Sequence, residues 1–487
     1  MCEKMTEVKK ITDYIWEIPK SGDMVVPGRI YADEEIIKNM LEEEKQKPEW
    51  NSLTQVKNVA CLPGIQKYSF ALADVHTGYG SPIGGVAAMD MKEGVAVFGL
   101  CGFDINCGLQ TLKTELTMKD IEPVKEKLAQ ELFETVPAGL GEEGNIRLNE
   151  SEMNELLVKG AEFVIERGYG IKEDLEFLEE YGKMAGAEPE AVSKKAKQRQ
   201  KKEIGTLGSG NHYLEVQVVE KIFDEEIGKA FGLFEGQILA SIHCGSRGLG
   251  HQIGMDYLQE LSRATEKYGI KVKDKELVCA PIQSEEGKKY LSAVNAGMNC
   301  AFANREAITH LARQAFSKTV GVAEEDVKLL YGVSHNTIKK EKHRVDGKTT
   351  EFLIHRKGST RGFAAGREEV CRPYRKVGHP IIVGGSMGTA SYILAGTQKG
   401  MDDIFGSAVH GAGRLMSRNQ AIREFKGESI VKELAGRGII IKGHSWKGIA
   451  EEADDAYKDI HRVVDVMHNS GVNKKVAMLR PVITIKG

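Results

Sequence analysis

The chain of 487 residues has no excess of either charge and no long apolar run. It carries 67 basic and 70 acidic residues, a formal charge of −3, and so lacks the global positive charge of many nucleic-acid-binding proteins. RNA or DNA would have to be bound by local basic patches. No apolar stretch approaches the roughly 20 residues of a membrane span, and the beginning, MCEKMTEVKK, lacks the apolar core of a secretory signal. We therefore expect no association with a membrane.

Cysteine is scarce: eight residues occur, and none forms a CxxC pair. So few thiols in so long a chain are not a disulfide framework, and they favour a reducing, cytoplasmic compartment. In that setting a cysteine with a special role is expected to be a metal ligand or a nucleophile. Glycine, in contrast, is abundant at 54 residues without a repeat. This excess indicates many tight turns and close approaches of the backbone to a ligand.

Strand-like and helix-like segments alternate along the chain, which predicts an α/β (α+β) fold with mixed β-sheets flanked by helices. Residues 33–47 predict a charged amphipathic helix, and 118–203 are mostly helical and highly charged. We expect one domain over residues 1–487, with 118–203 as a helical insertion. Strands are predicted near 65–73, 95–100, 108–112, 213–219, 238–243, 329–335, 352–358, 381–385, 438–443 and 482–487, and helices near 250–268, 287–317, 418–434 and 448–468.

Several of the 13 histidines lie where an apolar strand runs into a glycine-rich turn, the position at which α/β proteins place catalytic groups. The motifs are DVHTGYG, GSGNH, SIHCGSRG, YGVSHN and SAVHGAGR. A single histidine of this kind is usually structural, but five in one context indicate a functional site. With a thiolate and a carboxylate from CGFDINCG, they could hold one metal ion, or two that share a ligand. The donors are Asp104, Cys107, His212, His243 and His335. A Cys/His site binds Zn²⁺ more tightly than Mn²⁺, so these residues do not identify the metal.

Three other patterns are compatible with phosphate binding. The loops GGSMGTAS (384–391) and HGAGR (410–414) can direct backbone N–H groups at phosphate oxygens, although neither has the Walker A ending. The cation-rich stretch 356–376, and the run of six cations between Lys194 and Lys202, are either solvated faces or phosphate contacts. Candidates for RNA or phosphate contacts are Arg356, Lys357, Arg361, Arg367 and Arg414. Lys486 ends an apolar strand, where it reaches either water or a nucleotide phosphate.

The ordered set of motifs strongly resembles the RtcB family of RNA-splicing ligases from about residue 60 to the last residue. It comprises DVHTGYGSPIGG, GFDINCG, GTLGSGNHYLEV, IHCGSRGLGHQ, GVSHN, HRKGSTRGF, GSMGTASY, HGAGR, AYKDI and the terminal IKG. The resemblance implies a ligase that uses GTP and two Mn²⁺ ions. Such an enzyme joins an RNA 3′-phosphate or 2′,3′-cyclic phosphate to a 5′-hydroxyl, through a histidine–GMP adduct and an RNA-(3′)pp(5′)G end. It implies tRNA splicing or RNA repair in the cytoplasm, on tRNA halves or broken RNA ends, and archease as a partner.

The resemblance also assigns roles to residues of this chain. His410, which opens HGAGR, is the expected nucleophile, and the five metal-ligand candidates are the expected two-metal site. Tyr213 and Tyr457 are expected to stack on guanine. The expected guanylate-binding set is Asn211, Tyr213, Glu215, Ser386, Ser391, Ala412, Gly413, Tyr457 and Lys486. Two departures, SAV before the nucleophile and GSTRGFAAG, affect the expected substrate preference more than the activity.

Two other functions remain open at this point. A dinuclear metallophosphoesterase acting on nucleotides or RNA ends would use the same metal ligands to activate water, without a nucleophilic histidine or a guanine pocket. A non-catalytic RNA-binding subunit is disfavoured by the near-neutral charge and the lack of an aromatic RNA-binding motif. A ligase that attaches the nucleotide to lysine is disfavoured because no KxDG sequence is present.

Overall fold

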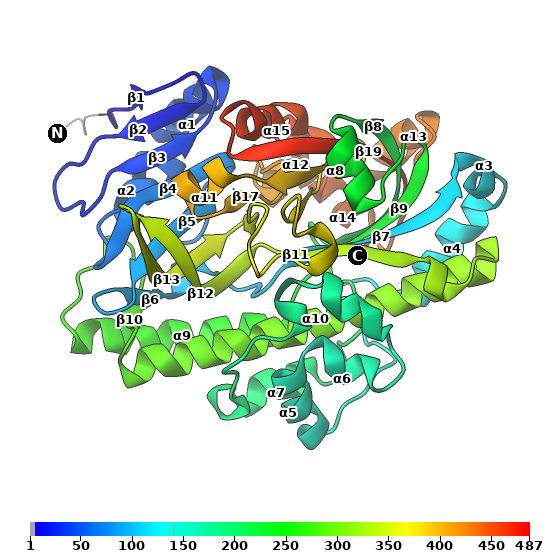
Figure 1. Ribbon diagram of the computed structural model, residues 1–487, viewed down its shortest axis with the longest axis horizontal. Coiled ribbons are helices and arrows are strands. Elements are labelled where there is room, and N and C mark those ends of the chain that lie inside the picture. The colour runs from blue at the N-terminus through cyan, green and yellow to red at the C-terminus, as the bar shows by residue number, and fades with distance from the viewer. Residues whose placement is uncertain (1–4, 140) are drawn as a thin grey trace.

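The computed structural model describes residues 5–139 and 141–487. Its first large sheet has seven strands and contains the N-terminal part of the chain (Figure 1). In spatial order these are β1 (Lys9–Lys10), β2 (Ile15–Ile18), β3 (Gly28–Tyr31), β4 (Ile65–His76), β5 (Ile83–Asp90), β13 (Lys348–Lys357) and β12 (Asn336–Val345).

The second large sheet has eight strands, and it carries most of the motifs that the sequence analysis singled out. Its main path is β11 (Lys328–Ser334), β7 (Gly108–Thr117), β9 (Gln237–Cys244), β8 (Tyr213–Ile222), β19 (Asn473–Lys486), β16 (Ser391–Gly396) and β15 (Pro380–Val383), with β18 (Ile440–Gly443) parallel to β19. Two small antiparallel pairs complete the strands: β6 (Val95–Val97) with β10 (Cys279–Pro281), and β14 (Ser359–Arg361) with β17 (Ser407–Val409).

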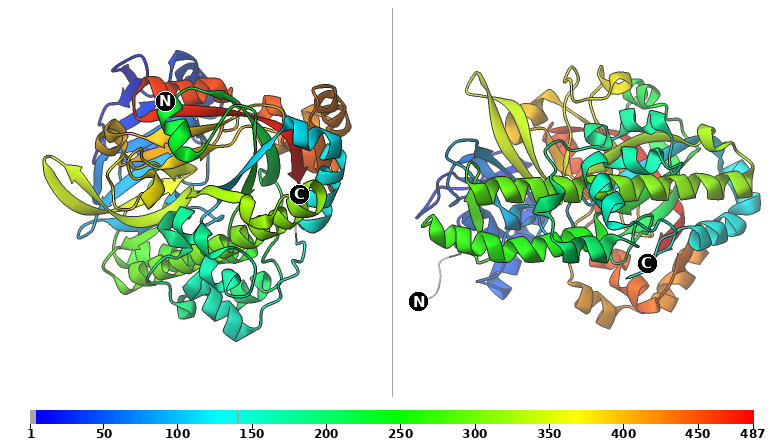
Figure 2. Two further views of the ribbon diagram at one scale, coloured as in Figure 1. Left: turned by 45° about the vertical axis from the view of Figure 1, so that its right-hand side comes forward. Right: turned by 90° about the horizontal axis from the view of Figure 1, so that it is seen from below.

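Two long helices, α9 (Arg247–Lys267) and α10 (Glu285–Val320), lie side by side below the two large sheets in the view of Figure 1, and Figure 2 shows them from two further directions. Helix α10 begins at the cap Ser284, whose hydroxyl accepts from the Gly287 N–H, and ends at Gly321 in the left-handed conformation. Its side chains are buried on nearly all sides, because the large sheet and α4 to α6 pack around it.

The segment 118–203 contains short helices joined by 3₁₀ turns and loops, so it is helical as predicted but more broken than its charge pattern indicates. Its helices are α3 (Met118–Ile121), α4 (Lys125–Thr135), α5 (Glu150–Lys159), α6 (Ala161–Ile165) and α7 (Lys194–Gln200). In the cationic helix α7, Ala196 and Gln200 are buried toward α9. The division into one domain with an insertion stays a prediction.

The remaining helices pack against strands of the two sheets or against one another. They are α1 (Glu34–Gln46), α2 (Ser52–Val59), α8 (Glu225–Phe231), α11 (Gln398–Ile404), α12 (Arg418–Glu424), α13 (Gly427–Gly436), α14 (Trp446–Glu451) and α15 (Ile460–Asn469). The mixed α/β class and most predicted strands are therefore confirmed. Two predicted helices are each divided, 418–434 into α12 and α13, and 448–468 into α14 and α15. No helix in the described part of the chain has the length and apolar character needed to cross a bilayer.

Candidate active site

The strand register explains why ligand candidates that are far apart in sequence lie together. In the antiparallel sheet, Gly108 at the start of β7 is paired with Ser334 at the end of β11 and with Cys244 at the end of β9. The next strand, β8, begins at Tyr213, which is paired with His243. In an antiparallel sheet, the start of one strand lies beside the end of the next. The adjoining ends of these four strands therefore bring together Cys107, His212, His243 and His335.

The donor atoms of these side chains form a compact cluster. The Cys107 Sγ lies 3.4 Å from His212 Nε2 and 3.3 Å from His243 Nε2, and His243 Nε2 lies 3.1 Å from His335 Nε2. Asp104 joins through its Oδ2, 2.9 Å from His212 Nε2. Ligands about 2.1 Å from one ion are spaced by roughly 3.0–3.4 Å, so the donors are spaced as ligands of a metal ion.

The hydrogen bonds behind the cluster fix which nitrogen faces it. The Nδ1 atoms of His212 and His243 donate to the carbonyls of Leu207 and Asn211, each at 3.1 Å. In the neutral rings both Nε2 atoms therefore carry lone pairs, and the His212 lone pair faces the Asp104 carboxylate. Lone pairs and a carboxylate that converge in this way repel one another unless a cation lies among them. The donor set thus fits two overlapping metal sites, Cys107–His243–His335 and Asp104–Cys107–His212.

Burial controls the ionisation of these ligands. It lowers the pKa values of His243 and His335 well below the ordinary histidine value, so both imidazoles stay neutral and able to bind a metal. Burial alone would raise the pKa of Asp104, but a proton on the adjacent His212 Nε2, the place that a bound cation would take, holds it at about 2. Burial also raises the pKa of the Cys107 thiol, so a bound cation is what would favour its thiolate form.

His410 lies beside this cluster and is oriented by Asp74. Its ring centroid is 5.0 Å from that of His335. The His410 Nδ1 donates to the Asp74 Oδ2 at 2.6 Å, and the backbone N–H of His410 donates to the same oxygen at 2.9 Å. Asp74 is completely buried near the end of β4. Because the proton is held on Nδ1, the other ring nitrogen, Nε2, keeps a lone pair available for attack.

The backbone around Asp74 is held from two sides. The Lys458 Nζ donates to the carbonyls of Ala73 and Val75, the neighbours of Asp74 in β4. Burial lowers the pKa of Lys458 to about 8, an effect that the Asp74 charge opposes. Gly413 crosses above Asp74 with φ +75°, and an added Cβ would lie 2.1 Å from the Asp74 carbonyl oxygen. Only glycine fits at this crossing.

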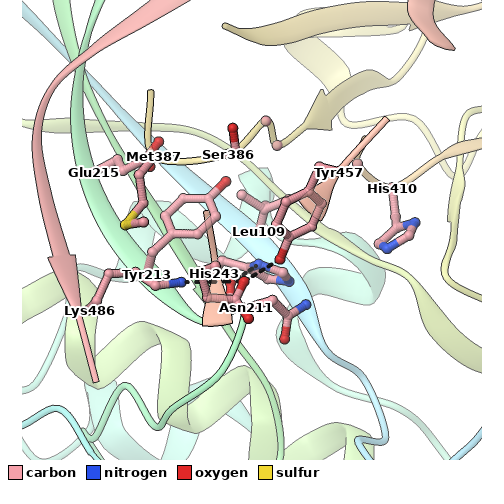
Figure 3. Close-up of a pocket in the computed structure, with 14 residues that line it drawn as sticks. Leu109, Asn211, Tyr213, Glu215, His243, Ser386, Met387, His410, Tyr457 and Lys486 are labelled. Carbon is pink, nitrogen blue, oxygen red and sulfur yellow. Dashed lines mark hydrogen bonds and ion pairs between the residues drawn. The ribbon is translucent and has the colours of Figure 1, made fainter. Parts of the chain in front are cut away.

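A narrow cleft, here called the inner cleft, adjoins His243 and His410 and contains most of the expected guanylate-binding residues (Figure 3). In Figure 3, Lys486 and His410 lie on opposite sides of the two tyrosine rings. The inner cleft is lined by Asn211, Tyr213, Glu215, Ser386, Tyr457 and Lys486, together with Met387 and Glu452.

The three other expected guanylate-binding residues lie directly behind this lining. The Ser391 hydroxyl accepts from the Gly385 N–H at 3.1 Å and so shapes the serine loop. The Ala412 N–H donates to the Gly384 carbonyl at 3.2 Å, which joins the HGAGR segment to that loop. Gly413 makes the close crossing described above.

The inner cleft combines a neutral carboxyl, a carboxylate and a cation. Burial raises the pKa of Glu215 to about 8, although Lys486, Thr484 and Gln217 oppose the shift. Glu452 is buried too, but Lys486 and Arg414 keep its pKa below the ordinary value. Burial lowers the pKa of Lys486. The Lys486 Nζ donates to the Gly210 carbonyl at 2.8 Å and lies 3.8 Å from Glu452.

The predicted RNA-contacting cations do not form one exposed patch, and two of them require a correction. Arg356 is completely buried in a bidentate ion pair with Glu341 at 2.6 and 2.9 Å. Arg361 is 3% exposed and pairs with Glu179 and Glu180. Neither guanidinium is available to a phosphate, because both stabilise the interior.

The other three cations have different surroundings. The Lys357 Nζ donates to carbonyls of the 79–81 turn and of Gly99, and burial lowers its pKa to about 8. Arg367 is partly exposed and pairs with Glu369. Arg414 donates to Tyr457 Oη at 2.9 Å and to Glu452 at 3.1 Å. Of the three, Arg414 lies closest to the inner cleft, next to two of its lining residues.

Three residues of the site were not assigned a role from the sequence: Asp74, Glu452 and Lys458. Asp74 was visible as a carboxylate at the end of an apolar run, YSFALADVH, where a buried charge indicates a specific partner. Lys458 stands inside AYKDI, next to Tyr457. Glu452 lies in a helical segment with other acidic residues, and no sequence signal separates it from them.

Known proteins are similar to this chain over almost its whole length. A sequence model described as "tRNA-splicing ligase RtcB" matches residues 55–487. A "tRNA-splicing ligase RtcB" of Thermococcus kodakarensis is 49% identical over 487 residues, covering 99% of this chain and all of the relative. Those of Archaeoglobus fulgidus and Methanococcus maripaludis are 48% and 46% identical, each over 99% of both chains. The chain therefore belongs to the RtcB family of tRNA-splicing ligases.

Proposed function

We propose that the protein is an RNA ligase that uses GTP and Mn²⁺ to join an RNA 3′-phosphate or 2′,3′-cyclic phosphate end to a 5′-hydroxyl end. The observation that carries the proposal is the His410 ring. Asp74 holds its proton on Nδ1 while its ring packs against that of a metal-ligand candidate. This arrangement suits a histidine that attacks phosphorus, and family membership supports it. The substrates are tRNA halves or broken RNA ends, and archease is the proposed partner.

In the first step, the His410 Nε2 attacks the α-phosphorus of GTP. The new N–P bond forms as the bond from the α-phosphorus to the bridging oxygen breaks, and pyrophosphate leaves with the electron pair. The ring becomes cationic, so the hydrogen bond from Nδ1 to the Asp74 carboxylate strengthens in the transition state. The buried carboxylate next to the ring therefore lowers the activation free energy of this step, and it also orients the ring.

In the second step, an oxygen of the RNA 3′-phosphate attacks the phosphorus of the histidine–GMP adduct. The N–P bond breaks, neutral His410 is restored, and the RNA carries a (3′)pp(5′)G end. In the third step, the 5′-hydroxyl of the other RNA attacks the RNA phosphorus, loses its proton, and releases GMP. A 2′,3′-cyclic phosphate has to be hydrolysed before the second step. A single site must therefore hold a nucleotide and two RNA ends.

Two Mn²⁺ ions bound by Asp104, Cys107, His212, His243 and His335 would supply positive charge to the triphosphate and to the leaving pyrophosphate. The chain's own contribution is the orientation of these ligands by the carbonyls of Leu207 and Asn211. That orientation turns the Nε2 atoms of His212 and His243 toward the Cys107 thiol and the other donors. Manganese is proposed from the family and not from the donor types, which favour zinc.

The inner cleft is the proposed guanine site. Guanine presents two adjacent donors, N1–H and the N2 amino group, which suit a carboxylate acceptor, and Glu452 lines this cleft as a carboxylate. Glu215 also lines the cleft and accepts through its carboxyl oxygens. Adenine has no donor at N1. Tyr213 and Tyr457 supply aromatic faces for stacking, and Lys486 supplies a cation close to them. We therefore expect a preference for GTP over ATP.

The experiment that tests the proposal separates ligation from phosphoester hydrolysis. The protein is incubated with Mn²⁺, GTP and two RNAs, one ending in a 3′-phosphate and one beginning with a 5′-hydroxyl. A joined product that requires GTP, and that is lost in His410→Ala, supports the ligase. Release of inorganic phosphate without joining, at equal rates in both variants, would instead identify a metallophosphoesterase.

A further inference from the structure

A second and larger cleft, here called the outer cleft, opens on the other side of His410. Its volume is about 500 Å³, and its wall includes Asp104, Cys107 and His335 as well as His410. Most residues proposed for guanine line the inner cleft, and two of them, Asn211 and Tyr457, line both clefts. The outer cleft also has walls from residues 43–50 and 76–83 that the inner cleft lacks, so it offers a different substrate a second approach to the same nitrogen. It is large enough for more than one nucleotide.

The rim of the outer cleft is apolar and exposed, which is unusual beside a charged site. Tyr79, Trp50 and Leu415 line the cleft and are 61%, 50% and 52% exposed. Within the described residues, Tyr79 is the most exposed of the large apolar side chains. A flat aromatic ring left in water next to a reactive centre provides a surface for a planar ligand.

The Tyr79 turn is held firmly, although the ring itself is exposed. Gly78 exchanges two hydrogen bonds with the side chain of Gln55, which is 2% exposed, and Lys357 donates to the Tyr79 carbonyl. The Tyr79 ring stands edge-on to Phe103, with centroids 6.1 Å apart and planes at 89°. These buried bonds order the turn before any ligand arrives, which lowers the entropy cost of binding.

Trp50 reaches the same cleft from the connection between α1 and α2. This connection is fastened to the segment before Tyr79 through Glu43, which accepts from the Thr77 hydroxyl at 2.6 Å and from the Ser52 hydroxyl at 2.8 Å. The Lys47 Nζ lies over the Trp50 ring, 5.6 Å from the ring centroid. The N-terminal 60 residues therefore contribute a wall of the active-site region, with an aromatic face and a cation together.

The charges that line the outer cleft suit a polyanion with planar groups. Lys47 contributes one cation, and the segment 414–418 contributes Arg414 and Arg418, which also pair with Glu452 and Glu451. Exposed aromatic rings occupy the rim between the cleft and solvent. Single-stranded nucleic acid carries both features, because its bases present π-faces that a duplex hides and its backbone is anionic. A ring that stacks on a base tolerates any base, as joining diverse RNA ends requires.

We propose that Tyr79 and Trp50 are stacking platforms for nucleobases of the single-stranded RNA whose 3′-phosphate is delivered to His410. This inference rests on the proposed ligase function and adds a substrate-binding site outside the guanine cleft. It assigns the outer cleft to the RNA 3′ end, and the N-terminal segment to RNA binding. GMP transfer to His410 does not need this surface, so the two reactions respond differently when the rings are removed.

The test compares Tyr79→Ala and Trp50→Ala with the parent in the full chain. The expected result is an unchanged rate of GMP labelling and a roughly tenfold higher KM for a 3′-phosphorylated single-stranded RNA, with kcat nearly preserved. Tyr79→Phe, which keeps the ring, should retain the parental KM. Trp446→Ala removes an aromatic side chain that is 58% exposed outside the cleft, and it should also behave as the parent.

Abasic RNAs separate stacking from a general disturbance of the cleft. One nucleotide at a time, among the last three before the 3′-phosphate, is replaced by a ribose without a base. At the stacked position the parent should lose affinity, and Tyr79→Ala or Trp50→Ala should lose little more. An equal loss on abasic and intact RNA would refute stacking. If the parent ligates but both alanine variants stay within twofold of its KM, the RNA site is wrong; if the parent neither takes GMP nor ligates, the ligase proposal itself fails.

Discussion

Replacing Asp74 with asparagine tests whether the buried carboxylate activates His410. The side chain keeps its shape, and its amide oxygen can still accept the His410 backbone N–H that Asp74 accepts at 2.9 Å. The same Oδ2 also accepts from His410 Nδ1 at 2.6 Å, so an amide oxygen in that place keeps both contacts without the charge, whereas an NH₂ group in that place loses both. An amide N–H directed at Nδ1 favours the tautomer with the proton on Nε2, which has no lone pair for attack.

The magnitude follows from comparing two effects. Loss of one charge-assisted hydrogen bond costs about 1.5–3 kcal/mol, which is roughly 10- to 150-fold in rate. Inversion of the tautomer is larger, since the equivalent exchange in a Ser–His–Asp triad lowers kcat about 10⁴-fold. Because Asp74 is completely buried, water cannot replace the lost acceptor. We expect Asp74→Asn to slow GMP transfer by about 10³- to 10⁴-fold.

The assay is single-turnover labelling with GTP and Mn²⁺, which reports the first chemical step without RNA. Asp13→Asn is the matched control, because this carboxylate side chain is 82% exposed and lies away from the site. The reasoning is refuted if Asp74→Asn labels within tenfold of the parent while binding Mn²⁺ normally.

Three further perturbations address the metal site, the inner cleft and the interior. Cys107→Ser removes a donor shared by both proposed metal sites, so Mn²⁺ affinity measured by calorimetry should fall at least tenfold; parental affinity would make this thiol merely structural. The folded pKa of Glu215 is about 8 against an ordinary 4.5, so its contribution to stability is complete below about pH 4.5 and declines as the pH rises toward 8. Glu215→Gln should therefore unfold at a higher temperature than the parent at pH 9 but not at pH 4.5, and a pH-independent difference would contradict the assignment. Arg356→Met leaves the buried Glu341 carboxylate without its cationic partner and should lower the free energy of unfolding by about 3–5 kcal/mol. Adding Glu341→Gln should restore part of this loss in chemical denaturation, and a simply additive loss would show that the two charges are not coupled.

The grouping of the metal-ligand candidates could be expected from the sequence because each of them stands at a strand end or in the turn next to it. Cys107 precedes β7, His243 lies near the end of β9, and His335 follows β11. What the sequence did not provide is the strand order β11-β7-β9-β8, which brings these ends to one edge. Pairing between strands more than 100 residues apart depends on the whole fold and leaves no local signal.

The cationic stretch was misread for a related reason. In β12 and β13 several buried positions are charged: Lys339 pairs with Glu179, and Arg356 pairs with Glu341. A pattern of apolar and polar residues assigns such side chains to the surface. Their partners lie on the neighbouring strand or on a distant loop, so the burial of these charges follows from tertiary pairing alone.

The divided helices near 418–434 and 448–468 show a third limit. Between α12 and α13, Phe425 and Lys426 have extended φ/ψ angles that end the first helix. At Gly427 an added Cβ would lie 2.2 Å from the Trp446 carbonyl, so the turn is fitted to α14. No proline marks this break, and the apolar periodicity continues through it. The sequence therefore does not show that α12 ends here, where the chain packs against a neighbouring helix.

The most direct test of the account is to map the attachment site of GMP. The parent protein is incubated with GTP and Mn²⁺, digested without acid, and analysed by mass spectrometry. The account predicts a single guanylylated residue, His410, through an acid-labile and base-stable bond, and its absence in His410→Ala. A GMP adduct on a lysine or on another histidine, or an undiminished adduct in the alanine variant, would contradict it.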